Sequence, residues 1–275
     1  MFRKIAISAT YALGLMSGAA LAQAMAEPET KDVAFSFEGP FGTFDEHQLQ
    51  RGLQVYTEVC AACHGLKFVT IGALADVGGP HLPEDQVKAY AAAFPINDEP
   101  SNPQYMDPAT SKMRALLPSD HFPANHAAVP PAPDLSVMAK ARAGFHGPMG
   151  LGISQLFNGM GGPEHIYSIL TSFTGETKDI AGTTFYENKA FPGGWMGMSN
   201  LALAAGQVTY ADGTESSLEN QAEDVAAFLT WAAEPKLMVR KESGFKAVLI
   251  LGMLSVLLYL TNKRLWAGVK RKKLH

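Results

Sequence analysis

The residues with the clearest chemical meaning form the motif Cys60-Ala61-Ala62-Cys63-His64. The 275-residue chain has two cysteines, and both lie in this motif. Two cysteines separated by two residues and followed by histidine form the attachment pattern of c-type haem. On a helical turn, both thiols reach the two vinyl groups of one haem and the histidine faces the iron. We therefore expect one haem c, bound covalently through Cys60 and Cys63, with His64 as an axial ligand.

A Cys-x-x-Cys pair can instead be the dithiol of a thiol–disulfide oxidoreductase. The adjacent histidine, the export signal described below and the lack of any further cysteine favour haem.

An electron-transferring haem needs a second axial ligand, and methionine opposite histidine raises its potential. Eight methionines lie outside the terminal apolar segments: Met106, Met113, Met138, Met149, Met160, Met196, Met198 and Met238. The best candidates stand in Phe191–Met198, whose glycines allow close approach of the backbone to a flat ring. Spacing alone leaves Met196 and Met198 both open.

Two helices are expected to position the motif. Thr43 and Glu46 form a capping box, after which one apolar face follows: Leu49, Leu53, Tyr56 and Cys60. A second capping box, Ser216 with Glu219, opens a helix that Pro235 stops; its apolar face is Leu218, Ala222, Val225 and Leu229. We expect the two helices to pack together.

The region between these helices is rich in glycine and proline and has weak periodicity. It predicts short helices and wrapping loops, with a short hairpin near Val208–Thr214, where Asp212-Gly213 is a turn signal. The fold class expected is mainly α: a single-haem c-type cytochrome domain with long wrapping loops, plus one C-terminal transmembrane helix.

Residues 1–26 resemble a cleaved signal peptide, with Arg3 and Lys4 before an apolar stretch and Ala24-Met25-Ala26 before the cleavage point. The alternatives are an uncleaved anchor and cleavage after Ala20-Leu21-Ala22.

At the other end, Ala247–Asn262 is uncharged, and Gly244–Trp266 is long enough to span a bilayer. A buried core helix is the alternative, but the basic tail that follows fits an anchor better. The positive-inside rule puts this tail in the cytoplasm. The expected layout is therefore a periplasmic haem domain over residues 27–242 and an anchor over 243–275, in the bacterial inner membrane.

The charge of the chain is segregated. The net charge of −4 combines −13 over residues 27–242 with +7 over 243–275 and +2 over 1–26. An acidic body excludes a nucleic-acid binder dominated by basic charge. It suits a basic soluble cytochrome c as partner, since opposite charges steer the encounter.

Four segments together resemble the cytochrome c1 family, the haem subunit of the cytochrome bc1 complex, in its alphaproteobacterial form. They are Arg51–His64, Pro133–Ser136 with the following Lys140–Arg142, Phe191–Met198, and Asp224–Pro235. The resemblance covers residues 34–275. Residues 143–162, with seven glycines, look like an insertion relative to mitochondrial forms.

The resemblance implies roles by position. It implies Met198 as the methionine ligand, Arg142 as the partner of a haem propionate, Tyr167 as an aromatic beside the haem, and Pro133–Ser136 as a distal-side segment. It also implies a one-electron carrier without substrate chemistry of its own, in a respiratory or photosynthetic quinol:cytochrome c reductase. Its partners would be cytochrome b, the Rieske iron–sulfur protein and a cytochrome c. The rival in the same class is another membrane-anchored c-type cytochrome, such as an oxidase subunit or a tethered shuttle.

Overall fold

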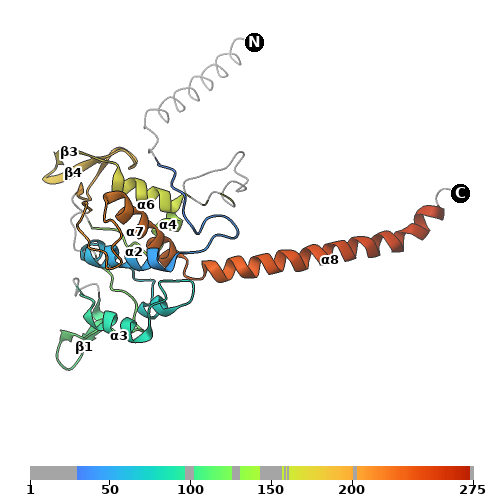
Figure 1. Ribbon diagram of the computed structural model, residues 1–275, viewed down its shortest axis with the longest axis horizontal. Coiled ribbons are helices and arrows are strands. Elements are labelled where there is room, and N and C mark those ends of the chain that lie inside the picture. Colours follow the sequence, from blue (N-terminus) through green and yellow to red (C-terminus); the bar gives the residue numbers. More distant parts are fainter. Residues whose placement is uncertain are drawn as a thin grey trace, which may run out of the picture.

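The fold is a mainly helical body from which one long helix extends (Figure 1). The computed structural model describes residues 30–96, 102–125, 131–142, 157, 159, 161–200 and 203–272. The predicted signal peptide therefore lies outside the described residues, as does nearly all of the predicted insertion. The described helices are α2 (Glu46–Glu58), α3 (Glu84–Ala93), α4 (Met138–Ala141), α6 (Gly162–Thr171), α7 (Leu218–Ala233) and α8 (Leu237–Lys272). Short 3-10 turns are η1 (Cys60–Ala62), η2 (Ile71–Ala75) and η3 (Pro103–Tyr105).

The two predicted helices are present as α2 and α7, and they cross at the centre of the body. The predicted apolar faces are buried at Leu49, Leu53, Tyr56, Val225 and Leu229. Both predicted N-caps are wrong by one or two positions. The Asp45 side chain accepts from the amides of His47 and Gln48, and Ser217 accepts from that of Asn220.

The crossing of α2 and α7 depends on a glycine and an ion pair. A Cβ atom added to Gly52 would lie 2.7 Å from the Cβ of Phe228 and 2.8 Å from the carbonyl carbon of Asp224. The preceding Arg51 donates from Nε and Nη2 to the two carboxylate oxygens of Asp224, at 2.9 and 3.0 Å. This bidentate pair fixes the register of the two helices.

Burial raises the pKa of Asp224 even though Arg51 opposes the rise, so desolvation outweighs the pairing. The Arg51–Asp224 pair therefore contributes more to the relative orientation of α2 and α7 than to the stability of the fold.

A second layer of helices covers α7 and carries one of the predicted haem contacts. Helix α6 packs on α7, and α4 contacts both. Gly162 opens α6 against the carbonyl of Ala139 in α4, where a Cβ atom would collide with the backbone. The backbones of α4 and α6 can approach this closely because the residue is glycine.

A small lobe on the other side of α2 holds η2, α3, η3 and a two-residue ladder of β1 (Met106–Asp107) with β2 (Lys112–Met113). It joins the core through an aromatic cluster: Tyr56, Tyr90, Phe94 and Phe122, with ring centroids 5.3–6.1 Å apart in four pairs.

The main sheet is a hairpin that the sequence did not predict. Strands β3 (Phe173–Ile180) and β4 (Thr183–Asn188) pair antiparallel, and β5 (Trp195–Met196) adds to β4. The hairpin forms one edge of the body in Figure 1. The hairpin predicted at Val208–Thr214 is wrong: a turn forms at Asp212-Gly213, where the Gly213 amide bonds the carbonyl of Tyr210, but no strand flanks it within these residues.

The predicted membrane anchor is present as α8, which begins at Leu237 and extends alone from the body (Figure 1). Within Leu237–Gly268, an 18-residue window has a mean hydropathy of 1.9 and none of it is buried in the body, as a membrane-spanning helix requires. The first turns still contact the body, because Lys241 donates to the carbonyls of Phe37 and Gly42 at 2.5 and 3.1 Å.

Candidate functional site

The cysteine motif stands on the turn that follows α2. Cys60 opens η1, and the amides of Cys63 and His64 both donate to the Cys60 carbonyl, at 3.1 and 2.8 Å. The two cysteines are half-buried and form no disulfide. One tight turn thus presents two thiols and a histidine together, which is what attachment of a single haem requires.

The environment of Cys60 disfavours a thiol–disulfide oxidoreductase. Burial raises the pKa of the Cys60 thiol to about 12, and the neighbouring Cys63 adds to the rise. A redox-active dithiol needs the opposite, a thiolate stabilised by positive charge or a helix N-terminus.

A backbone carbonyl orients the imidazole of His64. Its Nδ1 lies 2.7 Å from the carbonyl oxygen of Pro133, so Nδ1 carries the proton and donates it, and Nε2 bears the lone pair. The hydroxyl of the buried Tyr56 donates to the His64 carbonyl at 3.0 Å and anchors the backbone. An imidazole fixed in this tautomer is prepared to ligate a metal through Nε2.

The loop that supplies Pro133 is tied to the residues after the motif. The amide of Leu135 donates to the Gly65 carbonyl at 2.9 Å, and that of Lys67 donates to Asp134 Oδ2 at 3.0 Å. The assignment of Pro133–Ser136 to the distal side is therefore wrong. The loop contacts His64, the predicted axial ligand, and its backbone and carboxylate pair with Gly65 and Lys67.

Two buried asparagines that the sequence analysis missed brace the same turn. Asn125 Nδ2 donates to the Ala61 carbonyl at 2.6 Å, and Asn102 exchanges bonds of 2.6 and 2.9 Å with the backbone of Ala124. A Cβ atom at Gly65 would lie 2.6 Å from the amide nitrogen of Asn125. Nothing in local sequence marks an asparagine that bonds a backbone 64 residues away.

The two candidate methionine ligands have different backbones. Met196 lies in β5, opposite Tyr186 of β4, whereas Met198 follows the strand in an irregular segment; both are half-buried. The turn before β5 uses Gly193 and Gly194 at φ values of 84° and 78°, a conformation that favours glycine. The strand pairing thus fixes the backbone of Met196, while Met198 lies beyond it.

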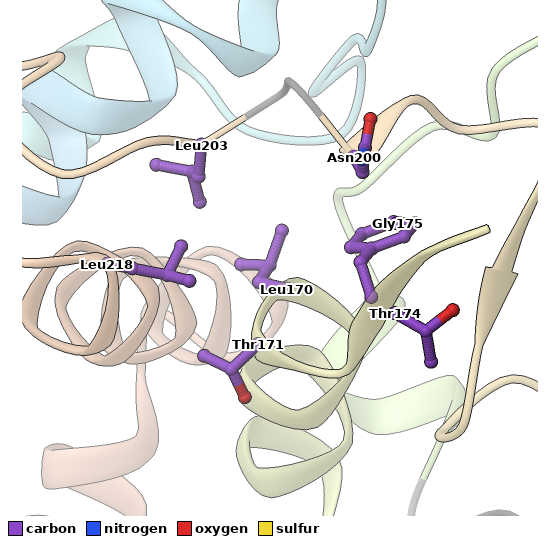
Figure 2. A pocket seen from close by; sticks show the side chains of 8 residues that line it. Leu170, Thr171, Thr174, Gly175, Asn200, Leu203 and Leu218 are labelled. Carbon is purple, nitrogen blue, oxygen red and sulfur yellow. The ribbon is translucent and has the colours of Figure 1, made fainter.

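A cavity of about 320 Å³ opens beside this segment (Figure 2). Asn200, two residues after Met198, lines it together with Leu170, Thr171, Phe173, Thr174, Gly175, Leu203 and Leu218. Figure 2 shows Leu170, Leu203 and Leu218 grouped on one side of it and Thr174 and Asn200 on the other. The Met198 segment therefore adjoins an open space between α6, α7 and the hairpin.

The structure places Arg142 and Tyr167 on neighbouring helices. Arg142 is the C-cap residue of α4 and is exposed. The pKa of His165 on α6 is lowered, first by the burial of His165 itself and then by the positive charge of Arg142. Tyr167 is half-buried on α6, with Lys31 Nζ 5.9 Å from its ring centre. The contacts made by the described residues do not join either side chain to Cys60, Cys63 or His64.

Comparison with known proteins decides the family. A sequence model described as the cytochrome C1 family matches residues 35–269. The chain belongs to the cytochrome c1 family. A cytochrome c1 of Cereibacter sphaeroides is 56% identical over 295 aligned residues, covering 99% of both chains. The mitochondrial cytochrome c1 haem protein of Saccharomyces cerevisiae is 37% identical, covering 87% of this chain and 73% of the yeast protein.

A third relative, cytochrome b/c1 of Bradyrhizobium diazoefficiens, is 39% identical over 85% of this chain and 35% of its own length. Membership of the cytochrome c1 family implies a haem c cofactor. The residues of this chain fit that group, since the cysteine motif, the oriented His64 and the methionine-bearing segment supply the donor types that a c-type haem takes.

Proposed function

We propose that this chain is the haem subunit of a quinol:cytochrome c reductase of the bc1 type. In this role it takes electrons from the Rieske iron–sulfur protein and passes them to a cytochrome c. The observation that carries the proposal is the Cys60–His64 turn, with its histidine oriented by Pro133, in a chain of the cytochrome c1 family.

We further propose the residues that hold the cofactor. Cys60 and Cys63 would attach one haem c covalently, and His64 and Met198 would ligate its iron. Arg142 would pair with a propionate, and Tyr167 would contribute an aromatic contact to the cofactor. When bound, the haem supplies reversible one-electron chemistry at its iron.

The surrounding residues tune this site. The carbonyl of Pro133 accepts the Nδ1 proton of His64, which makes the imidazole a stronger electron donor toward a metal. Asn125 and Tyr56 donate to the carbonyls of Ala61 and His64, so hydrogen bonds hold the backbone on both sides of Cys63. The turn is therefore built for a constant ligand geometry, which suits electron transfer.

The membrane layout follows from α8. We propose that the haem domain faces the periplasm and the tail the cytoplasm, because the basic residues gather at the C-terminal end of α8. Membership of a bc1 complex brings cytochrome b and the Rieske protein as neighbours. A polypeptide named cytochrome b/c1 in a relative supports the first of these.

Affinity purification of the tagged chain from membranes tests the proposal. Cytochrome b and a Rieske protein should copurify, and the preparation should reduce cytochrome c with quinol. That rate should fall as salt rises, since the body is acidic. Recovery of the haem-loaded chain with a terminal oxidase would instead support the alternative function, that of another membrane-anchored c-type cytochrome such as an oxidase subunit.

A further inference from the structure

A compact loop at residues 36–43 presents one exposed aromatic ring. Phe41 stands in this loop and is 72% exposed, whereas Phe35, Phe37 and Phe44 are buried. These three rings pack together at the base of the loop, with centroids 5.1 Å apart in the Phe35–Phe37 pair and 4.8 Å apart in the Phe37–Phe44 pair. A single exposed apolar side chain is common on protein surfaces, so its surroundings decide whether it has a role.

The loop is closed tightly upon itself. The amide of Thr43 donates to the carbonyl of Ser36 at 3.0 Å, which joins the two ends of the loop. A Cβ atom at Gly42 would lie 1.9 Å from the carbonyl oxygen of Glu38, so only glycine permits this turn. The backbone therefore holds Phe41 in a defined position.

The same loop is fastened to the long helix α8. The ring of Phe41 packs edge-on against that of Phe245 in α8, with centroids 5.4 Å apart and an interplanar angle of 74°. Lys241, one turn earlier on α8, donates to the carbonyls of Phe37 and Gly42, which flank Phe41 in the chain. Two contacts one helical turn apart thus fix the height of Phe41 along α8.

This height is the boundary of the membrane span. Glu242 and Lys246 form an exposed ion pair, and the uncharged run of α8 begins at Ala247. Phe245 precedes that run by two residues, which is about 3 Å along the helix axis. An ion pair belongs among water and headgroups, whereas an uncharged run of this kind belongs in the hydrocarbon. Phe41 and Phe245 therefore lie between these two zones.

We propose that the tip of this loop inserts Phe41 into the lipid headgroup region of the leaflet next to the body, beside α8. Surface-bound segments place Phe, Trp and Leu side chains at the boundary of headgroups and acyl chains. A lipid surface fits better than a protein partner, because one ring pair is far smaller than the roughly 800 Å² per partner of a stable protein interface. The loop gives the body a second contact with the bilayer and so restricts its swing about the start of α8. This inference requires that α8 crosses the membrane, and it is independent of the haem and of the electron-transfer partners.

Photo-crosslinking in native membranes tests the proposal and identifies what covers the ring. The full-length chain carries benzoylphenylalanine in place of Phe41, and after irradiation the tryptic peptide of residues 32–51 is analysed by mass spectrometry. We expect this peptide to gain the mass of a phospholipid. Ile180→benzoylphenylalanine is the matched control, since Ile180 is 49% exposed and ends β3 in the hairpin, on the side of the body away from α8 (Figure 1). The control should gain no lipid.

A fluorescence measurement on the reconstituted full-length chain gives a second readout. Phe41→Trp is placed in phosphatidylcholine vesicles with plain or brominated acyl chains, because bromine quenches a nearby indole ring. Relative to the wild type, the variant should gain emission in plain vesicles and lose most of that gain in brominated ones. Ile180→Trp should gain the same emission in both. The haem absorption spectrum reports that each variant is folded.

A crosslink from position 41 to a protein subunit would overturn the proposal and assign the ring to a protein interface. Emission from Phe41→Trp that bromine leaves unchanged would overturn it as well, because the ring would then stand in water. Neither result bears on the proposed electron-transfer function, which is tested by the haem spectrum and the copurifying subunits.

Discussion

Replacing Gly52 by alanine should separate the two helices that position the haem-binding turn. In an isolated helix this substitution stabilises by about 1 kcal/mol, because alanine is the better helix former. In this fold the new Cβ would lie 2.7 Å from the Cβ of Phe228, well inside the 3.4 Å at which ordinary contact begins. It would also collide with the backbone of Asp224, and no rotamer change relieves a clash with backbone.

The crossing must therefore open, and the Arg51–Asp224 bonds at 2.9 and 3.0 Å open with it. Overpacking costs about 1–3 kcal/mol, and a backbone clash lies at the upper end of that range. After the gain in helix propensity, the net destabilisation is about 2 kcal/mol. For a protein of this size, that corresponds to a Tm about 4–8 °C lower.

The assay is thermal unfolding of the haem-loaded chain in detergent, followed by circular dichroism and by the haem band. Gly244→Ala is the matched control, since a Cβ atom there meets nothing within 4 Å in helix α8. The control should unfold as the wild type does. A Gly52→Ala variant as stable as the wild type, or more stable, would show that helix propensity and not the close crossing governs this position.

The other predictions concern the ligand, the anchor and pH. Met198→Leu should lower the midpoint potential and open the iron to carbon monoxide, whereas Met196→Leu should do neither; the reverse pattern in a redox titration would assign the ligand to Met196. Truncation after Ser243 should give a soluble, haem-loaded domain, because the body contacts of Lys241 are retained; loss of haem would refute the anchor role of the removed segment. Stability should fall as pH rises from about 4.5 to about 8 and then level off, since folded Glu164 keeps a proton that the unfolded chain releases. At 1.36 kcal/mol per pKa unit this decline is on the order of 3–5 kcal/mol, and denaturant titrations of Glu164→Gln should not show it.

The features that local spacing encodes were predicted well. The apolar faces of α2 and α7 follow helical periodicity, and α8 follows from its length and hydropathy. The N-caps were misplaced because several residues near each helix start can cap. Asp45 caps α2 with a carboxylate, while Thr43 lies two residues too early.

The hairpin was missed because its sequence lacks both usual signals. Strand β3 is exposed along most of its length, so it shows no alternation of buried and exposed residues. Its turn places Ala181 and Gly182 at φ values of 53° and 82°, where Asn-Gly is the common pair. Because Ala181 occupies the first turn position in place of asparagine, the sequence does not show the usual turn signal.

Long-range contacts of the site were not predictable from local pattern. The carbonyl of Pro133 reaches His64 across 69 positions, and Asn125 reaches Ala61 across 64. Backbone acceptors leave no mark in the sequence. The resemblance identified the Pro133–Ser136 segment but gave it a distal position, whereas its Pro133 carbonyl contacts His64.

The central claim is that Cys60 and Cys63 hold one haem c through covalent bonds. The most direct measurement is the pyridine haemochrome spectrum of the purified, denatured chain, with the haem quantified per polypeptide. We predict one haem per chain, with the spectrum of a c-type haem, that stays with the polypeptide on a denaturing gel and is lost in a Cys60→Ala, Cys63→Ala double variant. A chain without haem, or with haem extracted by acidic acetone, would contradict the claim.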